Sequence, residues 1–185
     1  GLENSWNVKY EESNADDVAF ASMLIQSLEG VPGIDTSKPV AVGFSNGAAL
    51  THKIAIETDL VAAIAPHVSQ LLKENQPQPD GKKVSVMQLL AADDSLCPYD
   101  GGVGILGYDY MHGEDSAAVW AAHNGCDVEP VETQVEEHIR FEWDNCEDGR
   151  EVIHYRVNGM DHAIPPNVHG NTTARIVEFL IKARQ

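Results

Sequence analysis

A Gly-x-Ser-x-Gly motif at residues 43–47 constrains this chain more than any other feature, because it lies between two different hydrophobic patterns. The run 39–44 before the serine is almost wholly apolar and predicts a short strand covered on both faces. The residues from 46 to 58 have the spacing of a helix. In that setting the motif is typical of a nucleophilic Ser45 on a sharp strand–turn–helix elbow, with glycines that allow a close backbone approach. The alternative interpretation is a glycine-flanked turn with an ordinary serine.

Strands and helices are expected to alternate along the rest of the chain. The predicted strands are 39–44, 61–65, 84–92, 131–134, 138–143 and 151–157, and the predicted helices are 14–29, 46–58, 115–124 and one that starts after Asn171. This alternation indicates an α/β fold, with a mainly parallel sheet flanked by helices. In such a sheet, functional residues lie just after the strands, at their C-terminal ends.

Charge and hydropathy exclude some classes of partner. The 185 residues include 12 basic and 29 acidic side chains, a formal net charge of −17. Such a surface repels phosphate backbones, so we expect no nucleic-acid partner. No apolar run approaches the ~20 residues of a membrane span. Residues 1–6 have neither the basic start nor the apolar stretch of a signal peptide.

The three cysteines, Cys97, Cys126 and Cys146, do not have the spacing of a zinc site, and we expect neither a metal nor another cofactor. Cys126 and Cys146 flank strand-like residues. Two interpretations stay open for them: a disulfide, which would indicate an oxidising compartment, or reduced thiols like that of Cys97.

Acidic and histidine residues do follow the predicted strands downstream of Ser45. Asp93 and Asp94 come directly after the strand 84–92, and His162 follows the strand 151–157. A serine hydroxyl needs an imidazole to accept its proton, and the imidazole needs a carboxylate to fix its tautomer. The order Ser, Asp, His is that of an α/β-hydrolase. The backbone N–H of Asn46, the residue after the serine, is the expected oxyanion donor.

The other histidines are expected to have structural or surface roles. His138 and His154 lie at the start of and within predicted strands, and His67 comes before the acid, in the wrong order. His169 is the rival of His162. Solvent-facing positions are expected for His52, His112 and His123, and for Asp161.

Taken together, these residues resemble the esterase/polyhydroxybutyrate depolymerase family of α/β-hydrolases, which also contains feruloyl and acetylxylan esterases. The matching stretches are 16–20, 34–35, 43–47, 98–102, Trp120 with 124–126, Cys146 with 148–149, and 159–162 with Pro165. The resemblance implies Asp94, not Asp93, as the catalytic acid, because the family's acid lies four residues before the Pro98 stretch. It also implies a disulfide between Cys126 and Cys146.

The chain departs from the family pattern in three places. Leu90-Ala91 replaces a His-Gly pair before the acid, and Ile164 replaces a tryptophan after the histidine. In the family, further strands and an oxyanion loop precede the stretch that here begins at Ser5. We therefore expect residues 1–185 to be a single α/β-hydrolase domain that is a C-terminal portion. Its first strand would be an unpaired edge, completed by an N-terminal segment or a second chain.

The sequence thus predicts a secreted or periplasmic serine carboxylic-ester hydrolase that works through an acyl-enzyme on Ser45. The expected substrates are short-chain, feruloyl or acetyl, or polyhydroxyalkanoate-type esters, either small or polymeric. Two alternatives remain: a serine peptidase on the same scaffold, and a non-catalytic binding or assembly module without a complete oxyanion hole.

Overall fold

The computed structural model describes residues 5–9 and 14–185; residues 1–4, which enter the expectation about a signal peptide, lie outside the described residues. The helices are α1 (Asp17–Ser27), α2 (Asn46–Glu57), α3 (Gly113–His123) and α4 (Thr172–Lys182), with a 3-10 turn at Glu147–Gly149. The strands are β1 (Val40–Phe44), β2 (Ala63–His67), β3 (Ser85–Ala91), β4 (Gly102–Val103), β5 (Asp109–Tyr110), β6 (Val131–Val135), β7 (His138–Trp143) and β8 (Val152–Val157).

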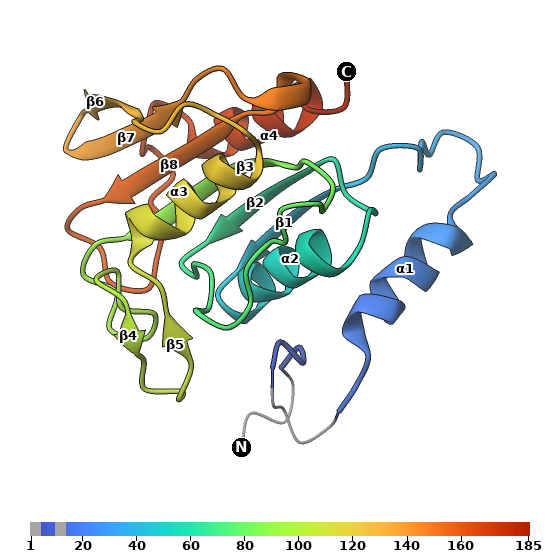
Figure 1. Ribbon diagram of the computed structural model, residues 1–185, viewed down its shortest axis with the longest axis horizontal. Coiled ribbons are helices and arrows are strands. Elements are labelled where there is room, and N and C mark those ends of the chain that lie inside the picture. The colour runs from blue at the N-terminus through green and yellow to red at the C-terminus, as the bar shows by residue number, and fades with distance from the viewer. Residues whose placement is uncertain (1–4, 10–13) are drawn as a thin grey trace.

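The main sheet has six strands in the order β1-β2-β3-β8-β7-β6 (Figure 1). The first four strands are parallel, and β7 and β6 join them antiparallel. This confirms the predicted α/β fold with a mainly parallel sheet. Because the parallel strands end at the same edge, the loops after β1, β3 and β8 meet there. Those loops carry Ser45, Asp94 and His162.

Helices cover both faces of the sheet, as alternating side chains on the strands require. One core joins α2 and α3 to the sheet through Leu50, Ile54, Trp120, Ile64 and Val86. The other core joins α4 to the opposite face through Ile176, Phe179, Leu180, Met87, Leu89 and Tyr155. Within β3, Val86 therefore faces α2 and α3, while Met87 and Leu89 face α4.

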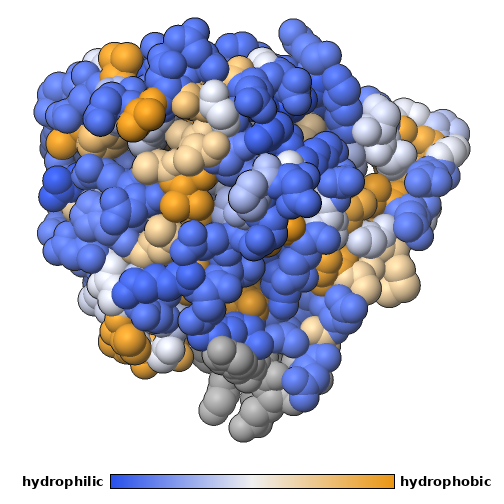
Figure 2. Space-filling model, in the orientation of Figure 1, coloured by the Kyte–Doolittle hydropathy of each residue, from blue (hydrophilic) through white to orange (hydrophobic). Residues whose placement is uncertain are grey.

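Strand β1 lies at the edge of the sheet and, among the described residues, pairs only with β2. The expectation of an edge strand is confirmed. The expectation that β1 is covered on both faces is wrong for these residues, since Val42 is 58% and Phe44 51% exposed. Helix α1 stands apart from the sheet and has no buried residue (Figure 1). Apolar side chains gather along this side of the molecule (Figure 2).

Several predicted boundaries differ from those of the structure by one to three residues. Helix α1 starts three residues later than predicted and is capped by Asp16, whose side chain accepts a hydrogen bond from Ala19 N. Strands β4 and β5, which lie in a part of the chain where no strand was predicted, form a small antiparallel hairpin. This hairpin leaves no periodic pattern in the sequence, because its strands are only two residues long. Among the described residues, no helix is both long and apolar enough to cross a membrane.

Candidate active site

Ser45 stands on a strained turn between β1 and α2. Its φ is 55°, a left-handed conformation that is rare for a residue other than glycine, and its N–H donates to His67 O at 2.9 Å. Gly43 makes the turn possible, because a Cβ there would come within 2.2 Å of Gly47 O. A Cβ on Gly47 would meet nothing closer than 3.9 Å. The motif therefore needs its first glycine for steric reasons, and the same expectation was wrong for the second.

Three predicted site residues meet above the C-terminal edge of the sheet. His162 Nε2 lies 2.7 Å from Ser45 Oγ, and His162 Nδ1 lies 2.8 Å from Asp94 Oδ2. With a proton on Nδ1, the imidazole donates to the carboxylate, and Nε2 is free to accept the serine proton. Asp94 is 6% exposed and His162 is partly buried, with the Phe44 ring packed edge-on against it. This geometry permits proton transfer from the hydroxyl to the imidazole.

Backbone donors hold the Asp94 carboxylate. Its Oδ1 accepts from Leu96 N at 2.9 Å and from Cys97 N at 2.8 Å, so the loop after β3 turns around it. Asp93, the adjacent acid, is exposed. Only one of the two neighbouring aspartates therefore faces His162.

A second contact joins the loop that carries Asp94 to the loop that carries His162. Asp161 accepts from both Ser95 N, at 2.8 Å, and Ser95 Oγ, at 2.9 Å. These bonds lower the pKa of the exposed Asp161 carboxyl, the backbone donor having the larger effect. The solvent exposure expected of Asp161 is confirmed, but the side chain also ties the His162 loop to the Asp94 loop. Sequence reasoning missed this contact because no pattern links positions 66 residues apart.

Asn46 has a role in addition to its predicted one. Its N–H belongs to the first turn of α2, where no intrahelical acceptor exists, so it is available to an oxyanion. Its side chain holds Trp6, accepting from Trp6 N at 2.6 Å and donating to Trp6 O at 3.1 Å. The segment around Trp6 is therefore fixed beside the serine.

Two histidines expected at the surface are buried. His52 is 2% exposed, and its Nδ1 accepts from Trp120 Nε1 at 3.2 Å. His123 is 7% exposed and lies 3.0 Å from Lys82 O. The prediction failed because each side chain packs against a segment remote in sequence, His52 against Trp120 of α3 and His123 against the chain at Lys82. Burial lowers the pKa of His52 to about 4 and that of the inner-strand His154 to about 3.

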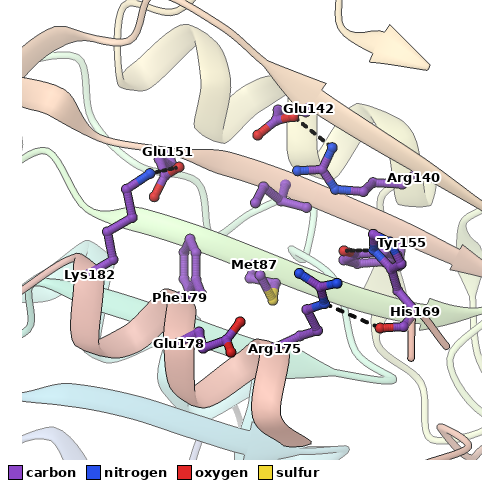
Figure 3. A pocket seen from close by; sticks show the side chains of 11 residues that line it. Met87, Arg140, Glu142, Glu151, Tyr155, His169, Arg175, Glu178, Phe179 and Lys182 are labelled. Atoms are coloured by element: carbon purple, nitrogen blue, oxygen red, sulfur yellow. Dashed lines mark hydrogen bonds and ion pairs between the residues drawn. The ribbon is translucent and has the colours of Figure 1, made fainter. Parts of the chain in front are cut away.

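His169, the rival of His162, lies away from Ser45, in an open depression of about 200 Å³ between α4 and the sheet (Figure 3). Its Nδ1 is 3.1 Å from Tyr155 Oη. Charged side chains around the depression pair with one another, as Arg140 does with Glu142 at 2.6 Å. Ser45 is not in the lining.

Of the two interpretations of the cysteines, the structure agrees with the one that includes a disulfide. Cys126 and Cys146 form a disulfide, which is confirmed, and Cys97 is a buried free thiol. Asp94, Cys97 and His162 offer ligand atoms within 4.8 Å of one another, close enough to hold a metal ion. Each of these atoms already has a hydrogen-bond partner, Cys97 Sγ donating to Tyr110 Oη at 3.3 Å. The cluster is therefore a hydrogen-bonded network as it stands.

Comparison with known proteins gives one informative relative. The chain is 28% identical over 170 residues to feruloyl esterase B of Piromyces equi, an alignment that covers 86% of the chain. It spans only 31% of the length of that relative. No protein-family model matches the chain. The chain is thus similar to part of a protein named as an esterase.

Proposed function

We propose that this protein is a serine carboxylic-ester hydrolase with Ser45 as nucleophile, His162 as general base and acid, and Asp94 as the acid that orients the imidazole. The observation that carries the proposal is the pair of short contacts on His162, 2.7 Å to Ser45 Oγ and 2.8 Å to Asp94 Oδ2. The likeness to a protein named feruloyl esterase supports ester hydrolysis as the kind of reaction. Feruloyl or acetyl, other short-chain, and polyhydroxyalkanoate-type esters are the candidate substrates.

The reaction would proceed in two half-reactions. Ser45 Oγ bonds to the ester carbonyl carbon while its proton passes to His162 Nε2. The resulting oxyanion accepts a hydrogen bond from the Asn46 N–H. The bond to the alcohol then breaks, and the alcohol leaves with the proton from Nε2. Water repeats these steps on the acyl-enzyme, releasing a carboxylic acid and restoring Ser45. Asp94 stays ionised and stabilises the imidazolium in both halves.

The test is turnover of p-nitrophenyl acetate and p-nitrophenyl butyrate by the wild type, Ser45→Ala and Ser37→Ala. Ser37 is exposed and precedes the N-terminal end of β1, at the opposite end of the strand from Ser45, so it controls for the effect of removing a hydroxyl. We expect hydrolysis by the wild type and by Ser37→Ala, and none above background by Ser45→Ala. A wild type that turns over neither ester would contradict the proposal and favour a non-catalytic module. Cleavage of peptides but not esters would favour the peptidase.

We also propose that the protein works in an oxidising compartment, secreted or periplasmic. The supporting observation is the disulfide between Cys126 and Cys146, because such bonds persist in oxidising environments and are rare in the cytosol. Free-thiol counting on protein isolated from its native source, with alkylation before lysis, would test this. One free thiol per chain is expected, and three would contradict the proposal.

A further inference from the structure

A small pocket lies beside the candidate nucleophile, with Ser45 and Asn46 in its wall. Its volume is about 30 Å³, and its other lining includes Ala49, Leu72, Cys97, Leu106, Tyr108 and Tyr110. Among the residues that the structure describes, none that lines the pocket carries a formal charge at neutral pH. Burial raises the pKa of the Cys97 thiol to about 11 and raises that of the Tyr110 hydroxyl as well, so this wall stays neutral.

The positions of the proton donor and the oxyanion donor indicate which part of the ester would lie in the pocket. His162 must give its proton to the leaving alcohol, so the alcohol lies on the His162 side of the serine. The oxyanion points toward the Asn46 N–H. The remaining substituent of the tetrahedral carbon is the acyl chain. The pocket is lined by Ser45 and Asn46 and not by His162, so we assign it to the acyl chain.

The size of the pocket limits the acyl chain. A cavity needs about 10–15 Å³ on this measure to hold one water molecule, so a 30 Å³ pocket has room for about two. A methyl group fits such a space, whereas a cavity that binds benzene has a volume of about 150 Å³, several times larger.

The pocket wall includes side chains held by several contacts, such as Tyr110, and one half-exposed side chain from the β4–β5 loop, Leu106. Tyr110 is 3% exposed, accepts from Cys97 Sγ and pairs with Leu72 in a β-bridge. Leu106, in the loop that joins the two strands, is 47% exposed and still lines the pocket. Its neighbour Ile105 is 73% exposed and does not.

We propose that this pocket binds the acyl part of the ester and restricts it to a neutral, acetyl-sized group, with Leu106 as a specificity-determining residue. The inference rests on the proposed esterase function. It names acetyl esters as the substrate class, although the relative with which the chain aligns is named a feruloyl esterase.

The test compares kcat/KM for p-nitrophenyl acetate, butyrate and hexanoate in the wild type, Leu106→Ala and Ile105→Ala. We expect the wild type to prefer acetate to butyrate by about tenfold or more, because each methylene that does not fit costs a factor of this order. Leu106→Ala should raise the butyrate-to-acetate ratio by about tenfold, and Ile105→Ala should leave it unchanged. Since Leu106 is half exposed in a loop, the fold should survive, which an unchanged Tm would verify.

The outcomes separate the two proposals. A wild type that hydrolyses acetate but prefers hexanoate overturns the inference and leaves the esterase function standing. An equal butyrate-to-acetate ratio of kcat/KM in Leu106→Ala and the wild type would also overturn the inference and leave the esterase function standing. A wild type that hydrolyses no ester overturns the proposed function, and the inference with it.

Discussion

At the scale of single residues, the site depends on which of two adjacent aspartates turns inward. Asp94 is held by two backbone N–H groups and reaches His162, whereas Asp93 faces solvent. The carboxylate that touches the imidazole can fix its tautomer, and an exposed neighbour contributes only a screened charge. The proposed mechanism therefore gives the two acids very different weights.

Replacing each aspartate by asparagine tests that difference. Asp94→Asn should lower kcat by about 10³-fold or more, because an amide can donate to Nδ1 and impose the wrong tautomer on the imidazole. Asp93→Asn, one position away and of the same shape, should change kcat by less than about threefold. Initial rates on p-nitrophenyl acetate provide the measurement. Equal losses in the two variants would refute the assignment of Asp94.

At the scale of elements, the β1–α2 turn brings the serine above the sheet. The chain passes so closely there that the Gly43 position has no room for a side chain, while Ser45 takes up a strained φ of 55°. The disulfide acts on a different element. It joins Cys126, just after α3, to Cys146, beside the turn that precedes β8. One feature shapes the site, and the other stabilises the scaffold.

The two glycines of the motif should respond differently to alanine. Gly43→Ala should lower the free energy of unfolding by about 2 kcal/mol or more, because its Cβ would overlap the Gly47 carbonyl and the elbow must move. Gly47→Ala is the matched control and should be neutral or stabilising by about 0.5 kcal/mol, since alanine favours a helix. Urea denaturation of both variants measures this. If Gly47→Ala were as unstable as Gly43→Ala, the claim that only the first glycine is sterically required would be wrong.

Removing the disulfide should weaken the fold without altering the chemistry. The Cys126→Ser/Cys146→Ser variant should lose about 3 kcal/mol, because the unfolded chain regains the freedom of a loop of about 20 residues. Its kcat/KM at 25 °C should stay within about twofold of wild type. Reductant should lower the Tm of the wild type and not that of the variant. An unchanged wild-type Tm in reductant would argue against the bridge.

At the scale of the whole molecule, the fold buries histidines as neutral side chains. Burial lowers the pKa of His52 and His67 to about 4 and that of His154 to about 3. In the unfolded chain each returns to about 6.5. Folding therefore releases protons below pH 6.5, and the stability that the neutral side chains provide is fully present only above that pH.

Stability should fall as the pH is lowered from 6.5 toward 4. Near pH 5 the unfolded chain should bind about three protons more than the folded one through these histidines. At lower pH, carboxylates whose pKa is lowered in the folded protein by hydrogen bonds, such as Asp161 and Glu142, add to the slope. His154→Gln should reduce the slope of unfolding free energy against pH by about one proton. Urea titrations between pH 5 and 7.5 would measure both slopes. A flat profile over this range would contradict the prediction.

Much of the fold could be predicted because local patterns specify it. The strands β7 and β8 and the helices α2 and α4 lie within one or two residues of the predicted ranges, since apolar runs and capping residues mark them. The β4–β5 hairpin could not be predicted because its strands are only two residues long. The burial of His52 could not be predicted because it depends on contact with Trp120 in a helix remote in sequence. The expectation that further strands complete the sheet beyond β1 stays a prediction. Val42 and Phe44 are the exposed side chains that such strands would cover.

The sequence by itself determined the alternating α/β pattern, the strand–turn–helix setting of Ser45 and the chain order of serine, aspartate and histidine. These are local features, fixed by periodicity and by short motifs. Only the tertiary structure decided which histidine meets the serine and which acid meets that histidine, that one glycine of the motif is sterically required, and that a 30 Å³ pocket lies beside the serine. The reason is physical: contact distances and cavity volumes arise when segments remote in sequence pack together, and no local pattern encodes them.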